Sequence, residues 1–345
     1  MSQKMRIVVA GCGGISQAWF KAACGRSDVE IVGLVDLRRD AAEKRAADFN
    51  LPNAAIGTKM KEIVTETRPD VLFNCTIPEA HASVTLEALK CGCHVLCEKP
   101  LADTMANARK MVTAARRAGK VLAVMQNRRF DLNIRRARAF IESGVIGKVT
   151  TVQSNFFIGA HFGGFRDRME HVLLLDMAIH TFDAARLITG ADPVSVLCHE
   201  WNPEGSWYDH DASAVAIFEM TGGIVYTYQG SWCAEGHSTP WEAQWRVIGT
   251  KGTMLWNGAA VFSAQVATPN GTAFYDARDV PVPEYPACAQ SGGHGGLICD
   301  FLDCLKTGRT PETVATDNIR SLAMVHGTIA SAKQGRRIRI AFKED

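Results

Sequence analysis

The sequence predicts an α/β protein in which an amino-terminal, doubly wound parallel sheet is followed by an α+β domain with a mainly antiparallel, open-faced sheet. Three observations lead to this prediction. The chain has 345 residues, more than one hydrophobic core usually holds, so two domains are expected. Short apolar runs alternate with helical segments in the first part of the chain, which is typical of a parallel sheet. Later strand-like runs follow one another with few helical signals, which indicates antiparallel pairing.

The first domain is expected to contain five apolar strands with helical segments between them. In chain order, these elements are strand 6–10, helix 17–24, strand 30–36, helix 40–48, strand 71–76, helix 79–90, strand 95–97, helix 103–118 and strand 121–126. In open sheets of this kind, ligands bind outside the carboxyl ends of the strands. Polar residues that directly follow a strand are therefore the first candidates for a site.

The turn after the first strand carries GCGGIS, residues 11–16. Gly11 permits a tight turn, and Gly13 lets backbone amides approach a pyrophosphate that the following helix N-terminus stabilises. Ser16 takes the place of a third glycine and is small enough for close packing of helix on strand. Because the motif follows a strand, opens a helix and precedes an acid, Asp36, at the end of the next strand, it predicts a dinucleotide-binding (Rossmann) domain. The alternative is a glycine turn without a ligand.

The residues around Asp36 bear on the choice of cofactor. Asp36 is placed to accept hydrogen bonds from an adenosine ribose, and its charge would repel a 2′-phosphate, so NAD is predicted. Arg38 and Arg39 follow immediately and can accommodate that phosphate, or they can simply lie in solvent at a helix start. NADP therefore stays possible.

The apolar run 95–97 ends on a charged pair, Glu98 and Lys99, and Pro100 stops the strand. Glutamate and lysine are rarely buried without partners, so the pair is either an exposed ion pair or is held beside a ligand. Its position at the carboxyl edge favours the second interpretation, with Lys99 beside a bound cofactor. The other residues at this edge are Ile77, Pro78, His81 and 127–130.

The helix expected at about 170–189 is apolar nearly all round, so it is predicted to be buried. Asp176, His180 and Asp183 are spaced i, i+4 and i+7 and therefore share a face. Asp183 has Arg186 three residues on, which predicts a structural ion pair. Asp176 and His180 have no obvious local partner except each other, and a buried polar stripe must either be hydrogen-bonded or serve a site.

The second domain continues with five expected strands: 194–201, 212–220, 223–232, 241–248 and 253–256. Both faces of 214–218 are apolar, so one face needs cover beyond the helices, and a homodimer or homotetramer is expected. Several polar or aromatic residues of the loops and strand ends can line a substrate pocket or simply pack: His161, Arg166, Trp201, Trp232, Glu235 and His237.

Composition excludes several classes of protein. Lys and Arg number 38 against 36 Asp and Glu, and the arginine pairs are scattered, so no nucleic-acid surface is expected. The apolar run 7–10 is too short for a signal peptide, and no segment has the length of a membrane span, so a cytoplasmic protein is expected. Eleven cysteines without framework spacing fit reduced thiols. Cys91, Cys93, His94 and Cys97 are not expected to bind zinc, because four ligands must converge.

Five motifs, taken in order, resemble one known family. They are GCGGIS at 11–16, Asp36 at a strand end, CEKPLA at 97–102, QNRRFD at 126–131 and DMAIH at 176–180. This set resembles the Gfo/Idh/MocA family of NAD(P)-dependent oxidoreductases, which act on sugars, cyclitols and related polyols. The likeness extends to the closing helices. The family has glycines before its Asp-x-x-x-His motif, whereas this chain has Glu170-His171-Val172-Leu173.

The resemblance implies a dinucleotide-binding domain at 1–127 and a substrate-binding and oligomerisation domain at 128–345. The closing helices, at about 293–334, are expected to pack back toward the first domain. By the same resemblance Lys99 contacts substrate and nicotinamide, while Glu98 and Pro100 hold it in place.

The site is predicted in three groups, and no metal is expected. The catalytic residues are Lys99, Asp176 and His180. The cofactor-binding residues are Gly11, Gly13, Gly14, Ile15, Asp36, Arg38, Thr76, Pro78, His81, Glu98, Lys99 and Asn127. The substrate-binding residues are Lys99, Arg129, Asn155, His161, Asp176, His180 and His237.

The predicted function is that of an NAD(P)-dependent dehydrogenase that oxidises a hydroxyl of a sugar, cyclitol or related polyol, or reduces the matching ketone. His180 would remove the hydroxyl proton, Lys99 would orient and polarise the oxygen, and Asp176 would orient His180 or bind a neighbouring hydroxyl. An NAD-dependent glycoside hydrolase, which oxidises its substrate transiently without net cofactor turnover, uses the same parts. A non-catalytic nucleotide sensor would need no Lys-Asp-His set.

Overall fold

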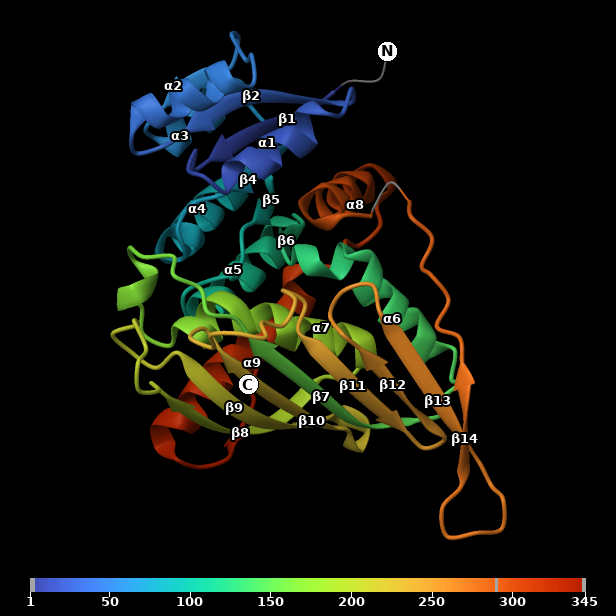
Figure 1. Ribbon diagram of the computed structural model, residues 1–345. Helices are drawn as coiled ribbons and strands as arrows, with labels where there is room; N and C mark the ends of the chain where they lie inside the picture. Colours follow the sequence, from blue (N-terminus) through green and yellow to red (C-terminus); the bar gives the residue numbers. More distant parts are fainter. Residues whose placement is uncertain (1–3, 289–290, 343–345) are drawn as a thin grey trace. The chain divides into compact units, whose positions relative to one another are not determined.

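The computed structural model describes residues 4–288 and 291–342, which form two compact units, each with its own sheet (Figure 1). The first unit comprises the chain up to Phe130, Ala287–Ile319 and the end from Phe342. The second comprises Asp131–Pro286 and Arg320–Ala341. Across the described residues, no helix has both the length and the apolar character needed to span a membrane.

The first unit is built on a six-stranded parallel sheet, which confirms the predicted fold class. The strands are β1 (Met5–Ala10), β2 (Val29–Val35), β3 (Ala55–Gly57), β4 (Val71–Asn74), β5 (His94–Cys97) and β6 (Leu122–Val124). Their order is β3-β2-β1-β4-β5-β6, and every neighbouring pair is parallel. The order reverses between β1 and β4, and ligands of doubly wound sheets bind at such a switch point.

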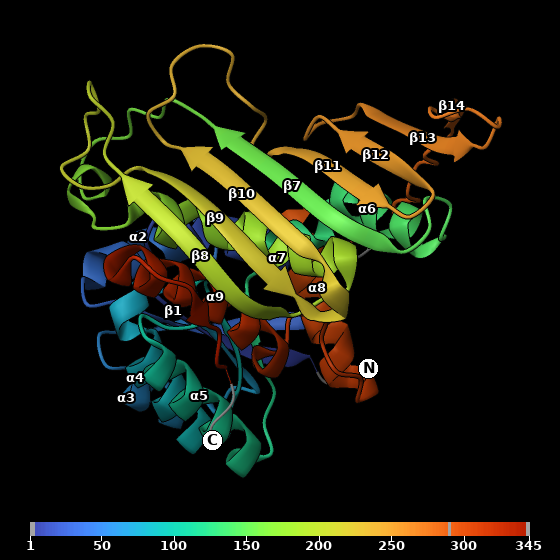
Figure 2. The ribbon, with the colours of Figure 1, turned by 90° about the horizontal axis from the view of Figure 1, so that it is seen from below.

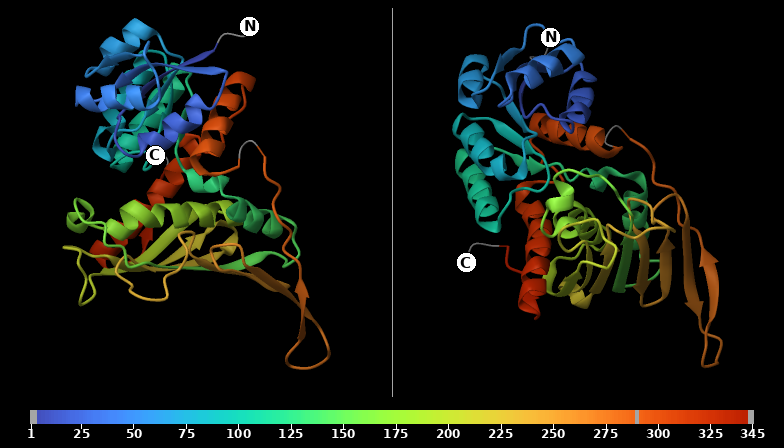
Figure 3. Two further views of the ribbon diagram at one scale, coloured as in Figure 1. Left: turned by 45° about the horizontal axis from the view of Figure 1, so that its top comes forward. Right: turned by 60° about the vertical axis from the view of Figure 1, so that its left-hand side comes forward.

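Helices cover this sheet on both faces (Figure 3). They are α1 (Ser16–Cys24), α2 (Arg39–Asp48), α3 (Met60–Thr67), α4 (Pro78–Lys90), α5 (Met105–Ala118) and α8 (Gly293–Thr307). Because both faces are covered, consecutive residues 7–9 of β1 are fully buried. Trp19 of α1 packs edge-on against Phe73 of β4, with ring centroids 5.0 Å apart. Helix α8, distant in the chain, packs against α1 and adds Leu297 and Phe301 to the same core.

As predicted, the second unit contains a mainly antiparallel sheet, which has nine strands. Its strands are β7 (Val149–Phe157), β8 (Pro193–Trp201), β9 (Ser213–Met220), β10 (Val225–Ser231), β11 (Gln244–Gly249), β12 (Gly252–Trp256), β13 (Phe262–Thr268), β14 (Asp276–Val280) and β15 (Ile338–Arg339). The order is β14-β13-β12-β11-β7-β10-β9-β8-β15, and of these pairs only β7 and β10 are parallel.

One face of this sheet carries the helices α6 (Leu132–Glu142), α7 (Ile179–Thr189) and α9 (Ala315–Gln334), the last of which contributes residues to both units. Figure 2 shows the other face uncovered. On the helix side, stacked rings run across the strands from Phe218 through Tyr226, Trp245 and Trp256 to Phe262, with centroids 5.3–6.3 Å apart. Such stacking of large apolar rings across strands holds the strand register.

The helix predicted at about 170–189 is observed from residue 172 to Thr189, and its first part is π-helical. A π-helical turn, η3 (Leu173–Ala178), precedes α7. His171 has a φ of 54°, a left-handed conformation that no residue inside a right-handed helix adopts, and its Nδ1 lies 2.6 Å from the buried Glu200 carboxylate. Because a π-turn bonds i to i+5, the i, i+4 spacing of Asp176 and His180 does not by itself place them on one face.

Candidate functional site

The glycine turn after β1 is shaped by Gly11. Its φ is 91°, and a Cβ atom there would lie 2.4 Å from the carbonyl oxygen of Cys75. Its amide donates to the Val35 carbonyl at 2.8 Å. Gly11 is therefore required by the chain itself, because only glycine adopts this conformation so close to another backbone.

The conformation and packing of the chain do not require glycine at positions 13 and 14. Both have ordinary φ values, and a Cβ on either would meet nothing within 4 Å. Among the described residues, neither amide donates a hydrogen bond. Ser16, fully buried, donates its hydroxyl to the Gly13 carbonyl at 2.7 Å and fixes the loop from within. Open space beside two unused amides at the start of α1 is the arrangement that a pyrophosphate requires, so the turn fits a dinucleotide.

Asp36, at the end of β2, is held by the same turn. Its Oδ2 accepts from the Cys12 amide at 2.7 Å, and its Oδ1 accepts from the Arg38 amide at 2.9 Å. The Arg39 side chain instead pairs with Glu43 at 2.8 Å. Burial, followed by the Asp36 charge, raises the pKa of the Cys12 thiol to about 12, so this cysteine packs as a neutral group. The carboxylate is thus fixed at the loop, and one of the two arginines is already engaged elsewhere.

Replacing Asp36 with alanine is expected to shift the ratio of the NAD and NADP dissociation constants toward NADP by about tenfold, or about 1.4 kcal/mol. The reason is that the repulsion of a 2′-phosphate disappears together with the acceptors for the ribose hydroxyls. Titration of both nucleotides measures the shift, and Glu62→Ala, an exposed acid of α3, serves as the control. A wild-type protein that already prefers NADP would contradict the NAD assignment.

Glu98, after β5, is a buried carboxylate with defined partners. Its Oε2 accepts from the Lys99 amide at 2.8 Å, and its Oε1 accepts from the Trp19 indole at 3.0 Å. Its own amide donates to the Asn74 carbonyl at 2.8 Å. The charged pair predicted from the sequence is therefore not a surface ion pair, because the glutamate holds the lysine's backbone from inside the unit.

His81 supports the same segment from the other side. It is fully buried, with Nδ1 2.7 Å from the Pro100 carbonyl and Nε2 3.0 Å from the Thr76 carbonyl. Burial lowers its pKa, against the raising effect of the two carbonyl contacts. Both nitrogens are engaged by backbone, so this ring, which the sequence predicts as a cofactor contact, joins the loops after β4 and β5. The backbone around Lys99 is thereby held on both sides, by Glu98 at the Lys99 amide and by His81 at the Pro100 carbonyl.

His294, at the start of α8, joins this group and was missed by the sequence reasoning. Its Nε2 lies 3.7 Å from the Glu98 carboxylate, and its Nδ1 lies 3.3 Å from the Asn127 amide nitrogen. The signal available was a histidine set between glycine pairs before a helix, in SGGHGG at 291–296. The contact itself joins segments too far apart in sequence to be read from spacing.

Arg129, predicted to bind substrate, lies in a short 3₁₀ helix, η1 (Asn127–Phe130), and its side chain is almost fully buried. It pairs with Asp317 at 2.9 Å and donates to the Glu312 carbonyl at 3.2 Å. The structure places it in a buried ion pair, because QNRRFD turns its second arginine inward.

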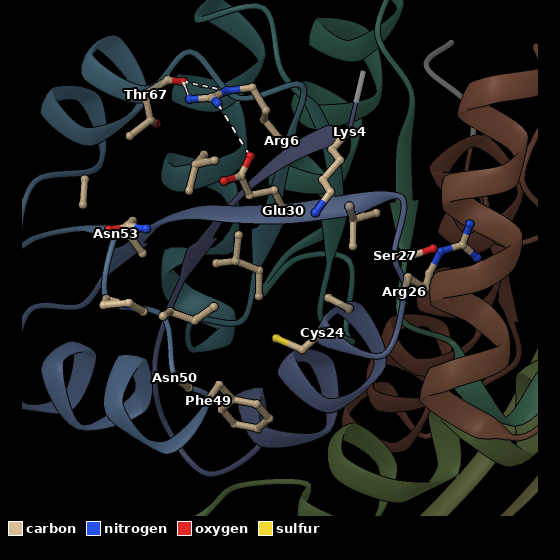
Figure 4. A pocket seen from close by; sticks show the side chains of 18 of the residues that line it. Lys4, Arg6, Cys24, Arg26, Ser27, Glu30, Phe49, Asn50, Asn53 and Thr67 are labelled. Atoms are coloured by element: carbon tan, nitrogen blue, oxygen red, sulfur yellow. Dashed lines mark hydrogen bonds and ion pairs between the residues drawn. The ribbon is translucent and has the colours of Figure 1, made fainter. Parts of the chain in front are cut away.

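A hollow of about 710 Å³ in the first unit lies at the opposite edge of the sheet (Figure 4). Lys4, Cys24, Glu30 and Phe49 line it, at the amino ends of β1 and β2. The glycine turn follows the carboxyl end of β1, so this hollow is not the predicted cofactor site.

In the second unit, Asp176 has a partner that the sequence did not reveal. Arg166 donates from Nε to its Oδ2 at 2.8 Å and lies over the rings of Phe162, at 5.1 Å, and Phe165, at 4.8 Å. His180, in the first turn of α7, is buried in the same unit. A loop ten residues upstream therefore folds back and supplies the ion-pair partner of Asp176, which the helical spacing did not indicate.

The remaining member of the polar stripe behaves as predicted. Asp183 lies 3.7 Å from Arg186 and accepts from the Ser321 hydroxyl at 2.6 Å. Arg186 also pairs with Asp192 at 2.9 Å. This buried network is fully partnered, so Asp183 is structural.

The other predicted substrate contacts are spread over the second unit. Ser154 and Phe156 are buried on the helix side of β7, so Asn155 between them points to the uncovered face, away from α7. His161, 61% exposed at its side chain, stacks on Trp207 and lies 2.6 Å from Glu235.

His237 is exposed in a loop, where it has a φ of 43°. Within the part of the chain that the structure describes, no three His, Cys, Asp or Glu side chains are grouped to hold a metal ion.

Comparisons with known proteins bear on this arrangement. A family model described as "Oxidoreductase family, NAD-binding Rossmann fold" matches residues 5–126, and one described as "GFO/IDH/MocA C-terminal domain" matches residues 134–255. The chain is 33% identical to D-glucoside 3-dehydrogenase of Escherichia coli over 59% of this chain and 60% of that protein. It is 25% identical to inositol 2-dehydrogenase of Rhizobium meliloti over 98% of this chain and 99% of that protein.

A similar solved structure is that of an oxidoreductase from Agrobacterium radiobacter in complex with NAD+, L-tartaric acid and magnesium. Its TM-score is 0.85 at 20% identity, with 98% of this chain and 99% of that chain covered. At this identity the likeness shows that the two chains share a fold.

Proposed function

Because this chain belongs to the Gfo/Idh/MocA family and is an NAD-binding oxidoreductase, we propose that it oxidises a hydroxyl of a sugar, cyclitol or related polyol, or reduces the matching ketone. The observation that carries the proposal is that the backbone around Lys99 is held in place at the carboxyl edge of the first sheet. Lys99 has its amide held by Glu98, and the carbonyl of the next residue, Pro100, is held by His81. A lysine fixed in this way at the ligand edge is suited to orient a reacting oxygen.

The first unit would hold the cofactor through named groups. The amides of Gly13 and Gly14, with the start of α1, would bind the pyrophosphate, and Asp36 would accept from the adenosine ribose. When bound, NAD supplies the hydride acceptor. The protein's task is then to place the substrate carbon and to handle the hydroxyl proton.

Lys99, Asp176 and His180 are assigned that task. The Lys99 ammonium would polarise the substrate oxygen, and the His180 imidazole would take the hydroxyl proton. Asp176, whose carboxylate is oriented by Arg166, would bind a neighbouring hydroxyl or orient His180. These roles follow the family resemblance residue by residue, and the buried settings of Glu98 and His180 support them.

The names of the relatives support a polyol or sugar as the substrate class. The Escherichia coli relative is named for a D-glucoside and the Rhizobium meliloti relative for inositol. Both are named dehydrogenases, so the alternative of an NAD-dependent glycoside hydrolase is not favoured.

The proposal is tested by incubating the purified protein with NAD or NADP and a panel of cyclitols, aldoses, alditols and glycosides. Reduction of the nicotinamide, followed by absorbance, is expected with NAD and at least one panel member. Release of free sugar from a glycoside without net absorbance change would instead establish the hydrolase. No turnover across the panel, by a protein that binds NAD, would contradict the proposed substrate class.

We further propose that the protein is a homodimer or homotetramer. On the uncovered face of the second sheet, the apolar side chains of Leu197, Val215, Ile217 and Val225 are each 37–40% exposed. Apolar groups gathered on one face of a sheet favour association, because burial removes them from water. Sedimentation at micromolar concentration is expected to show more than one subunit, and Ile217→Lys should lower the association. A wild-type monomer under these conditions would contradict the proposal.

A further inference from the structure

We infer that Arg45, on α2, is a positioning residue for the cofactor: it orients and polarises the backbone amides that receive the pyrophosphate. This inference rests on the cofactor site of the proposed function. Its test is a binding measurement without substrate, so it can fail while the substrate chemistry stands, and the reverse also holds.

Arg45 reaches from α2 to the back of the glycine turn. Its Nη2 donates to the Gly13 carbonyl at 3.0 Å and lies 3.5 Å from the Cys12 carbonyl. The Arg45 side chain is 11% exposed, and its Nε is buried without a partner among the described residues. Its remaining ionic contact, with Asp48 at 3.7 Å, is long. Among the described residues, the side chain thus contacts mainly the two loop carbonyls.

Through the geometry of the peptide bond, the contact of Arg45 with the carbonyls also sets the direction of the amides on the ligand side. In a planar trans peptide, the C=O of one residue and the N–H of the next point in opposite directions. Holding the Cys12 and Gly13 carbonyls therefore turns the Gly13 and Gly14 amides away from Arg45. Those are the two amides that no described residue uses, and open space lies beside their α-carbons.

The charge adds to the orientation. A cation that hydrogen-bonds a carbonyl polarises the same peptide unit, which makes its N–H a better donor to an anion. Ser16 also donates to the Gly13 carbonyl, through its hydroxyl at 2.7 Å, but it brings no charge. Arg45 accordingly strengthens phosphate binding in particular, whereas Asp36 acts on the ribose.

The test compares Arg45→Met with Lys44→Met. Both variants remove one positive charge from the same helix and one contact to Asp48, but Lys44 is 76% exposed and does not reach the loop. Dissociation constants are measured by calorimetry for NAD, ADP-ribose and adenosine. Arg45→Met is expected to raise the dissociation constants of NAD and ADP-ribose by about tenfold. The dissociation constant of adenosine should change by less than about twofold, because only the first two ligands carry the pyrophosphate. Lys44→Met should leave all three within about twofold of wild type.

Two results would overturn the inference. One is wild-type affinity of Arg45→Met for ADP-ribose, and the other is an equal loss for adenosine, which would indicate general damage to the domain. Arg45→Lys keeps the charge but lacks the planar, longer guanidinium group, so its affinity for ADP-ribose should lie between wild type and Arg45→Met. If Arg45→Met does not fold, as judged by its melting curve, the lysine variant decides: wild-type affinity for ADP-ribose in that variant would overturn the inference.

Discussion

Replacing Lys99 with alanine is expected to lower kcat for NAD reduction by about 10³-fold with any substrate that the wild type oxidises. The negative charge that develops on the substrate oxygen loses its ammonium partner. The backbone of this segment should keep its position. In both the wild type and the variant, Glu98 accepts a hydrogen bond from the amide of residue 99 and His81 contacts the Pro100 carbonyl. The dissociation constant for NAD should therefore rise by less than about tenfold.

Single-turnover absorbance at saturating NAD, together with a separate NAD titration, distinguishes the two effects. Lys90→Ala is a suitable control, since Lys90 is exposed at the end of α4 and takes no part in the site. A second variant, Glu98→Gln, keeps the acceptor oxygen but replaces the other oxygen with an NH₂ group, which cannot accept. It should therefore disturb both kcat and the NAD affinity. Near-normal turnover in Lys99→Ala would remove the lysine from the mechanism.

Local signals carried most of the fold prediction. The apolar run at 194–201 is observed as β8 (Pro193–Trp201), and GCGGIS connects β1 to the start of α1 as expected. These predictions succeeded because a strand, a tight turn and a helix start are each set by neighbouring residues. Strand β3 (Ala55–Gly57) was missed, because a run of three half-buried residues is too short to show the alternation of a strand.

Contacts between distant segments set the limit for the site. The strand end at Glu98 could be placed beside a ligand from topology alone. Its partners Trp19 and His294 could not be predicted, because nothing in the spacing of residues 19, 98 and 294 requires them to meet. The same reason explains why Arg166 was not assigned to Asp176.

The helix predicted at about 170–189 begins only after His171, and the cause is different. Residue 171 is a histidine, and the pattern of the following residues is helical, so nothing signalled a left-handed backbone there. The buried pair of His171 with Glu200, whose carboxyl pKa is raised by burial, accompanies that conformation. A tertiary contact thus accompanies a helix start that the local sequence pattern did not indicate.

His180→Ala is expected to lower kcat by about 10³-fold while leaving the NAD dissociation constant within about twofold of wild type. The imidazole is assigned the hydroxyl proton, and it belongs to the second unit, whereas Gly13, Gly14 and Asp36 belong to the first. A general base works only in its neutral form. In the oxidation direction the wild-type kcat should therefore rise with pH as the imidazole loses its proton. In His180→Ala this rise should disappear.

Single-turnover absorbance at several pH values measures both effects, and His210→Ala, an exposed histidine of the same unit, is the control. If Lys99 and His180 act together on one oxygen, kcat of the double variant should be little lower than that of the slower single variant. Losses among residues that act together in catalysis are not additive. Independent, multiplying losses would separate the two roles. Normal hydride transfer in His180→Ala, with the pH dependence retained, would leave His180 as a buried residue of α7 and assign the proton to another group.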